Sequence, residues 1–221
     1  MRLILAGQKA FGREALKAIR NAGHEVPLVV APADEGDALW RYAFGTGEVT
    51  ITSLTEDWVR SADADLIVAA HSHTFIGRRS RAATRLGAIG YHPSLLPRHR
   101  GRDAVRWTVA MGDPVAGGSV YWFTDNVDGG PIAAQDWCFV RPGEDYRSLW
   151  RDKLFPMGLD LLLRVLKDLD NGVLVAVPQS EEAGVATWEP SWDRPPMHRP
   201  ELPELGTVAG YEVRAARGAE R

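Results

Sequence analysis

Two short segments of the chain carry residues suited to acid–base chemistry. Residues 91–101 read YHPSLLPRHRG, and residues 127–131 read VDGGP. His92 ends a short apolar run and precedes Pro93, which favours extended backbone before it and ends the strand there. Asp128 lies 36 positions beyond His92, after a second apolar run and a turn. A histidine and an aspartate brought together from two strand ends would suit proton transfer at a carbonyl group.

Each residue has a plainer interpretation when it is taken alone. A single histidine such as His92 is more often a structural residue than a catalytic one. Asp128 in VDGG would suit a turn aspartate that accepts a hydrogen bond from its own backbone. The two segments together favour the catalytic interpretation, because they contain polar and glycine positions that packing alone does not require.

Short apolar strands alternate with helical segments through most of the chain. We expect strands at 2–6, 26–30, 49–52, 65–70, 88–91 and 118–123, and helices at 13–22, 55–60, 76–86, 103–111 and 146–171. Pro156 should break or kink the last helix, and Gly172 should end it. This alternation predicts an α/β fold, a Rossmann-like and mostly parallel sheet, in a catalytic domain at residues 1–175.

The C-terminal part of the sequence has a different composition. Residues 176–221 are rich in proline and tryptophan and lack a clear period, so we expect a short irregular extension with disorder beyond about residue 205. Trp188 and Trp192 are expected to cover apolar surface of the domain, since large aromatic side chains bury much area. An acceptor pocket or a contact in a homodimer is the alternative.

Composition excludes several classes of protein. The net charge of −3 and a pI of about 6.1 give no basic footprint for nucleic acid, although residues 98–102 read RHRGR. A single cysteine, Cys138, excludes an internal disulfide, and no apolar run approaches the roughly 20 residues needed to cross a bilayer. We therefore expect a cytoplasmic protein with no membrane or nucleic-acid partner.

Two further motifs lie at the ends of predicted strands. Gly7, Gln8 and Lys9 open the first helix, where backbone N–H groups could bind an anion, but the spacing matches neither a P-loop nor GxGxxG. His71 and His73 form an HxH pair after the strand at 65–70. HxH alone is weak support for zinc, so we expect no metal.

Beyond these local patterns, the chain resembles a known family over roughly residues 1–190. HPSLLPRHRG followed by DGGP is similar to the folate-dependent formyltransferases, and LAGQKAFGREAL, DLIVAA, GRDAVRWTVAMGD, VYWFTDNVDGGPI and EEAGVATWEP occur in the family's order. The opening and YHPSLLPRHRG are most similar to the hydrolase domain of 10-formyltetrahydrofolate dehydrogenase. GRD..W also resembles formyltransferases of amino sugars and of peptide-synthetase substrates.

The resemblance implies a formyl donor, 10-formyltetrahydrofolate, and a set of roles. His92 and Asp128 would be catalytic: Asp128 would orient His92 and take the proton of the attacking amine, and His92 would donate to the formyl oxygen. The folate-binding residues would be His73, Thr74, Phe75, Ile76, Leu96, Thr124, Asp125, Asn126 and Val127. Contacts to the acceptor or another anionic group are assigned to Gly7, Gln8, Lys9, Arg98, Arg100 and Gly101.

One position departs from the family pattern. The transferases usually have asparagine two residues before the catalytic histidine, and this chain has Gly90. The hydrolase domain also lacks that asparagine, so Gly90 gives some weight to hydrolysis. The expected function is formyl transfer to a small-molecule amine, an amino sugar or an amino acid derivative. The alternatives are 10-formyltetrahydrofolate hydrolysis and folate binding without catalysis.

Overall fold

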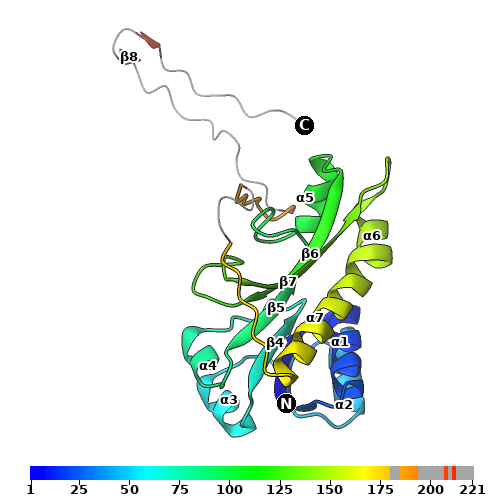
Figure 1. Ribbon diagram of the computed structural model, residues 1–221, viewed down its shortest axis with the longest axis vertical. Coiled ribbons are helices and arrows are strands. Elements are labelled where there is room, and N and C mark those ends of the chain that lie inside the picture. The colour runs from blue at the N-terminus through cyan, green and yellow to red at the C-terminus, as the bar shows by residue number, and fades with distance from the viewer. Residues whose placement is uncertain (180–184, 194–206, 209–210, 213–221) are drawn as a thin grey trace. The chain divides into compact units, whose positions relative to one another are not determined.

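A single sheet with helices on both faces forms the larger part of the protein (Figure 1). The computed structural model describes residues 1–179, 185–193, 207–208 and 211–212, and the statements below concern these residues. By its contacts the chain divides into two compact units, Met1–Glu189 and Pro190–Arg221. The predicted division after residue 175 stays a prediction.

Seven described strands make up the sheet, in the order β3-β2-β1-β4-β5-β6-β7. Their bounds are β1 Arg2–Gly7, β2 Glu25–Val30, β3 Thr50–Ile51, β4 Leu66–Ala70, β5 Ala88–His92, β6 Val115–Trp122 and β7 Ile132–Phe139. The first five strands in chain order pair in parallel, whereas β6 is antiparallel to β5 and β7 is antiparallel to β6. The predicted Rossmann-like, mostly parallel sheet is therefore confirmed, with two antiparallel strands at one edge.

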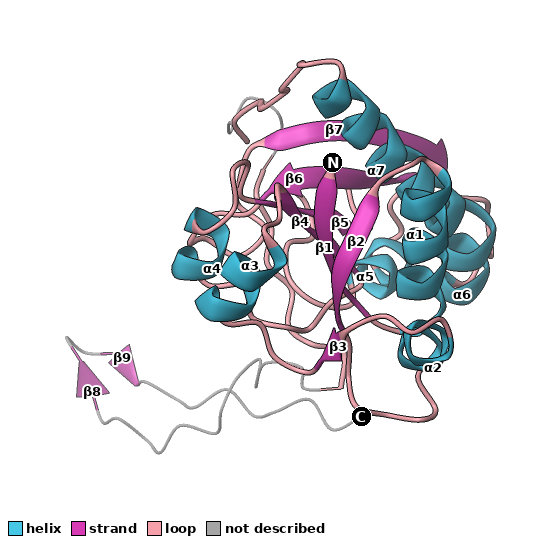
Figure 2. Ribbon diagram, turned by 90° about the horizontal axis from the view of Figure 1, so that it is seen from below, coloured by secondary structure: helices cyan, strands magenta, loops and turns pink. Residues whose placement is uncertain are grey.

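Helices cover both faces of the sheet (Figure 2). They are α1 Lys9–Asn21, α2 Ala38–Gly45, α3 Glu56–Ala62, α4 Arg78–Ala82, α5 Ala104–Ala110, α6 Tyr146–Leu149 and α7 Phe155–Asp170. Helices α1, α2 and α7 pack on one face with side chains such as Leu5 and Val68, and α3 and α4 lie on the other with Ile4 and Ile67. Neighbouring residues of β1 thus point to opposite faces, as the pleat of a strand requires.

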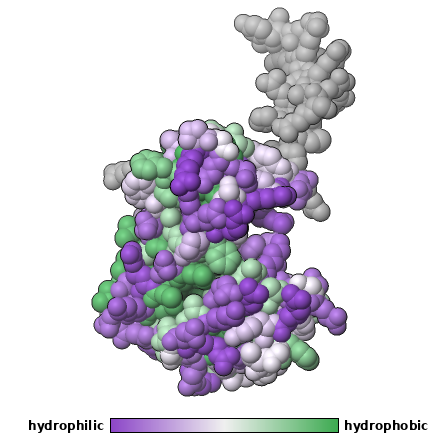
Figure 3. Space-filling model, turned by 90° about the vertical axis from the view of Figure 1, so that its right-hand side faces the viewer, coloured by the Kyte–Doolittle hydropathy of each residue, from purple (hydrophilic) through white to green (hydrophobic). Residues whose placement is uncertain are grey.

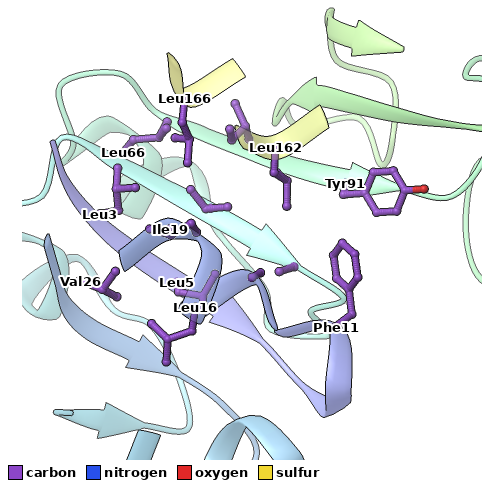
Figure 4. Close-up of a cluster of buried hydrophobic side chains, with 14 of the residues drawn as sticks. Leu3, Leu5, Phe11, Leu16, Ile19, Val26, Leu66, Tyr91, Leu162 and Leu166 are labelled. Carbon is purple, nitrogen blue, oxygen red and sulfur yellow. The ribbon is translucent and has the colours of Figure 1, made fainter. Parts of the chain in front are cut away.

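The first face has a continuous apolar core behind the end of β5 (Figure 4). The rings of Phe11 and Tyr91 stack with centroids 5.3 Å apart, and the hydroxyl of Tyr91 donates to the carbonyl of Leu154 at 2.7 Å. Apolar surface also remains in view on the side of the molecule that lies to the right in Figure 1 (Figure 3). The packing of Tyr91 fixes the backbone of β5 next to His92.

Several elements differ from the sequence-based expectation. Helix α2 and strand β7 were not predicted, and the helix expected at 76–86 is confined to Arg78–Ala82. The helix expected at 146–171 is divided by a π-helical turn, Trp150–Leu154, directly before Pro156 in the first turn of α7. Pro156 explains why the irregular turn lies here, because proline has no N–H to donate to the preceding turn of the helix.

The predicted irregular extension is described only in part. Its expected disorder falls mainly on residues outside the described ones, although Thr207–Val208 (β8) and Tyr211–Glu212 (β9) pair as antiparallel strands within the second unit. Trp188 is 55% exposed, and the expectation that it covers apolar surface stays a prediction.

Candidate active site

Three strand ends meet at one edge of the sheet. Gly7 of β1 pairs with Ala70 of β4, and Ala69 of β4 pairs with Gly90 of β5, so the loops after these parallel strands leave from the same edge. The chain order reverses between β1 and β4, which is the switch point where open α/β sheets bind ligands. His92 is the last residue of β5 and lies at this edge, as predicted.

Asp128 reaches His92 by a different route from the one expected. Because β6 is antiparallel to β5, its end lies at the opposite edge, where the N–H of Phe123 donates to the carbonyl of Ala88 at 2.8 Å. The following loop folds back along the sheet face, and Asp128 adopts a φ of +50° within it. The structure therefore brings the predicted pair together, although Asp128 is not at a strand's carboxyl edge.

The hydrogen bonds of His92 define which ring nitrogen faces the aspartate. Nε2 of His92 lies 2.6 Å from the backbone carbonyl of His99, and because a carbonyl only accepts, Nε2 carries the proton. Nδ1 lies 3.7 Å from Oδ2 of Asp128, longer than a hydrogen bond. Such distances are common before a substrate binds. Nδ1 is therefore the nitrogen available for proton transfer.

Two donors hold the carboxylate of Asp128. The N–H of Gly101 donates to Oδ2 at 2.7 Å, and the hydroxyl of Tyr121 donates to Oδ1 at 2.5 Å. Burial first, then the neighbouring Asp128, raise the pKa of Tyr121 well above its usual value, so the hydroxyl remains a donor at neutral pH. Tyr121 was not predicted, although its position opposite Gly90 across the strand pair places it on the face of His92.

The loop after His92 is fixed by a buried polar cluster. The imidazole of His99 is 2% exposed, with Nε2 at 2.7 Å from Asp113 and Nδ1 at 3.1 Å from Glu189. Arg98 binds Asp113 through two nitrogens, at 2.7 and 2.8 Å, so its guanidinium is engaged within the protein. This cluster holds the carbonyl that binds His92. Its role was not predictable, because Asp113 and Glu189 meet His99 only in the folded chain.

The segments predicted to bind folate are joined by ion pairs. Arg81 donates to the carbonyl of Ile76 at 2.7 Å and to Asp125 at 2.6 Å, and Arg78 also pairs with Asp125. The carboxylate of Asp125 is thus occupied by two arginines. Phe75 is 86% exposed and Val127 is also exposed, so each segment presents an apolar side chain.

The remaining predicted folate residues lie on or near the same loops. Thr74 donates its N–H to the hydroxyl of Ser72 at 3.0 Å, and the hydroxyl of Thr124 accepts from the N–H of Asn126 at 3.2 Å. Leu96 is buried in the loop after β5, where its N–H donates to Ser119 at 3.1 Å. The side chain of Leu96 is therefore part of the loop's packing.

The loop after β1 contains a buried polar group without a partner. Gln8 is 7% exposed, and its Nε2 makes no hydrogen bond within the described residues. Gly7 is packed so tightly that a Cβ atom would lie 2.7 Å from the carbonyl oxygen of Ala70. The side chain of Lys9 is exposed, and the backbone N–H of Lys9 donates to the carboxylate of Asp37 at 2.7 Å. Gln8 and Lys9 thus offer donors beside the edge that carries His92.

Two histidines after β4 face this loop and are uncharged near neutral pH. Burial, then the positive charge of Lys9, lower the pKa of His71 to about 4. Burial, then Arg102 and Lys9, also lower the pKa of His73. The two rings lie 6.1 Å apart, and among the described residues no group of three or more His, Cys, Asp or Glu side chains could hold a metal ion.

Gly90 lies on the same face as His92, and an aromatic ring covers it. A Cβ atom at position 90 would lie 2.5 Å from Cε1 of Phe123. The ring of Phe123 stacks on that of Tyr121, with centroids 5.1 Å apart. The space beside Gly90 is therefore filled by an apolar ring.

Comparison with known proteins identifies the family. Residues 48–166, more than half of the chain, match the formyl transferase family. The chain belongs to this family. The mitochondrial 10-formyltetrahydrofolate dehydrogenase of Mus musculus is 34% identical over 219 residues, which cover 88% of this chain and 23% of that protein. The chain thus spans about a quarter of the length of the first curated relatives that it matches.

Solved structures of formyltransferases share the fold. Glycinamide ribonucleotide transformylase 1 of Symbiobacterium toebii matches with a TM-score of 0.71 at 20% identity, over 81% of this chain and 92% of that one. An N-formyltransferase of Helicobacter canadensis, in complex with folinic acid and dTDP-3-aminofucose, matches with a TM-score of 0.71 at 15% identity, over 94% and 76% of the chains. Among the residues of this protein that the structure describes, no helix is long and apolar enough to span a membrane.

Proposed function

We propose that this formyltransferase-family protein moves the formyl group of 10-formyltetrahydrofolate to the amine of a small molecule, an amino sugar or an amino acid derivative. The observation that carries the proposal is the pairing of Nδ1 of His92 with Oδ2 of Asp128 at 3.7 Å. With Nε2 held by the carbonyl of His99, the remaining ring nitrogen and the carboxylate face the same space. An acid and a base at that separation suit the two proton movements of acyl transfer.

In the proposed reaction, the acceptor nitrogen attacks the formyl carbon and a C–N bond forms. The proposed acid is the imidazolium form of His92, in which Nδ1 as well as Nε2 carries a proton. Nδ1 donates its proton to the formyl oxygen as negative charge develops there, which lowers the barrier. Asp128 takes the proton from the attacking amine, and Tyr121 and Gly101 keep its carboxylate in place. The bond to N10 of the folate then breaks as the formyl oxygen returns its proton to Nδ1 of His92. Asp128 passes the proton of the amine to N10, and tetrahydrofolate and the formamide leave.

The donor is proposed to lie between the loops joined by Arg81 and Asp125. Phe75 and Val127 present apolar surface from the two loops, which fits a flat heteroaromatic ring. Backbone groups near Ile76 and Asn126 would bond the polar edge of that ring. The ion pairs of Asp125 support this assignment, because they fix the separation of the two loops.

The acceptor is proposed to lie beside the loop after β1. The unpartnered Nε2 of Gln8 and the exposed ammonium of Lys9 would bind an anionic group on the acceptor. Neutral His71 and His73 line the same edge and would accept or donate hydrogen bonds without adding charge. Arg98 is assigned to the loop's own structure, since Asp113 occupies its guanidinium.

Hydrolysis of 10-formyltetrahydrofolate is the second candidate, with water as the attacking group. Phe123 fills the space beside Gly90 where the family's transferases usually have an asparagine. The relative at 34% identity bears the name 10-formyltetrahydrofolate dehydrogenase, the protein whose hydrolase domain this sequence resembles. Both observations are consistent with water as the acceptor.

One experiment distinguishes the candidates. The purified protein is incubated with 10-formyltetrahydrofolate, alone and with a panel of amino sugars and amino acid derivatives, while tetrahydrofolate release is followed by absorbance. Release that depends on one amine, with its formamide detected by mass spectrometry, is the expected result. Equal release without any amine, with formate as product, would favour hydrolysis. Binding of the folate without release would contradict both activities.

A further inference from the structure

The segment after α7 runs along the start of β7 and ends next to the Asp128 loop. Val177 exchanges two backbone hydrogen bonds with Ile132, at 2.7 and 2.9 Å, and the indole N–H of Trp122 donates to the carbonyl of Val175 at 2.7 Å. These three bonds fix the backbone two residues before Gln179. The side chain of Gln179 is partly buried in unit Met1–Glu189.

The carboxamide of Gln179 uses all its hydrogen-bonding capacity. Its nitrogen donates to the carbonyl of Asp128 at 2.8 Å and to that of Gly130 at 2.7 Å. Its oxygen accepts from Nε and Nη2 of Arg100, at 3.1 and 2.6 Å. A glutamine amide has two N–H donors and two acceptor lone pairs, and all four are paired here.

These bonds connect the two loops that carry the proposed catalytic groups. On one side Gln179 holds the backbone of Asp128, which has a φ of +50°, a conformation that needs support from its surroundings. On the other side it holds Arg100, between His99, whose carbonyl binds His92, and Gly101, whose N–H binds Asp128. Movement of either loop would change the distance between His92 and Asp128.

We propose that Gln179 is a positioning residue that sets the distance between the His92 imidazole and the Asp128 carboxylate by linking their loops through Arg100. This inference rests on the proposed function of these two residues. Only an amide fits both sides. A carboxylate would face the two carbonyl oxygens with negative charge, and an apolar side chain of similar size would leave both carbonyls and the guanidinium without these bonds.

The kinetic test compares Gln179→Met and Gln179→Glu with the wild type. A displacement of about 1 Å at a reacting group lowers turnover on the order of 100-fold, so kcat is expected to fall about 10- to 100-fold in both variants. KM for 10-formyltetrahydrofolate should change less than kcat, because Gln179 bonds the backbone at Asp128 and Gly130 and none of its hydrogen bonds is made to the proposed folate residues. Arg164→Met, an exposed position on α7, is the control for a general surface substitution. Wild-type kcat in Gln179→Met would overturn the proposal.

A second measurement does not depend on activity. The amide proton of Gly101 donates to Asp128, so its hydrogen exchange, resolved by NMR, reports on the contact between the loops. Exchange should become at least about tenfold faster in Gln179→Met, and in Arg100→Met, which breaks the same link from the other side. The double variant should exchange no faster than the faster single variant.

The two measurements separate the failure of one proposal from the failure of the other. If the wild type releases no tetrahydrofolate with water or any amine, the proposed function is wrong, while accelerated exchange at Gly101 would still support the link. Unchanged exchange at Gly101 in both single variants would overturn the link, whatever the activity. Thermal unfolding of each variant shows whether the fold is retained.

Discussion

The ring of Phe123 occupies the space into which a side chain at Gly90 would project. A Cβ atom at position 90 would lie 2.5 Å from Cε1 and 2.9 Å from Cζ of this ring, and 3.3 Å from Cβ of Ala69. Phe123 is itself held by stacking on Tyr121. The glycine and the phenylalanine are therefore complementary, which explains how a chain of this family accommodates glycine at this position.

Gly90→Asn is expected to destabilise the protein and not to raise its turnover. Introducing a side chain into filled space costs about 1–3 kcal/mol of the free energy of unfolding. Urea unfolding measures this loss, and the double variant Gly90→Asn/Phe123→Ala, which removes the obstructing ring, should recover part of it. A large rise in formyl release by Gly90→Asn would contradict the prediction and identify the natural chain as a weakened catalyst.

His92→Ala is expected to lower formyl release by at least about 1,000-fold, because the imidazole acts on charge that develops in the transition state. The affinity for the folate should change by less than about tenfold, since ground-state binding depends on other groups. Steady-state kinetics and fluorescence titration with tetrahydrofolate provide the two measurements. Turnover retained in this variant would exclude the proposed mechanism.

Asp128→Asn should be about as damaging as His92→Ala, because the amide keeps the shape of the side chain but cannot take a proton. If the two residues act as one unit, the double variant loses little more activity than either single variant. If the two single substitutions raise the activation free energy by amounts that add in the double variant, His92 and Asp128 act independently.

Most of the main elements, and the place of His92 at a strand end, were predictable because their signals are local, whereas the proposed pairing of His92 with Asp128 rested on the two segments taken together and on the family resemblance. Pro93 marks the end of a strand, and VDGG marks a tight turn, whatever the rest of the fold. The direction of β6 was not predictable, since an antiparallel partner for β5 depends on pairing between distant segments. Strand β7 was missed because its exposed centre, with Gln135 and Asp136, lacks the pattern of a buried strand.

Helix α2 and the groups that support the site show two further limits. Asp37 caps α2 through bonds to the N–H groups of Leu39 and Trp40, a signal that was present in the sequence and not used. Gln179 is different, because its four hydrogen bonds exist only after the chain has brought 179, 100 and 128 together. No pattern in the sequence of residues 176–189 distinguishes Gln179 from its neighbours.

Tyr121→Phe removes one of the two donors that the described residues provide to the Asp128 carboxylate, and it leaves the ring in place. An unpaired, largely buried acceptor costs about 1–3 kcal/mol, so turnover should fall roughly 10- to 100-fold if the carboxylate shifts or loses support. The aromatic stack with Phe123 is retained, so thermal stability should fall less than in Tyr121→Ala. Unchanged turnover in Tyr121→Phe would show that the Asp128 carboxylate does not need the Tyr121 hydroxyl to hold its position.

The last prediction concerns the pH dependence of stability at His71. Burial first, then the charge of Lys9, lower the folded-state pKa of His71 to about 4 from 6.5, so the folded protein binds this proton only in stronger acid than the unfolded chain does. As pH falls below 6.5, the unfolded state gains the proton first and stability decreases until about pH 4, by a total on the order of 3 kcal/mol. His71→Asn is the matched variant, because His71 has a φ of +57° and asparagine tolerates that conformation.

Guanidinium unfolding at pH 7 and pH 4.5 should show a smaller loss of stability in His71→Asn than in the wild type. Equal losses in the two proteins would mean that His71 is not the residue that resists protonation in the folded state.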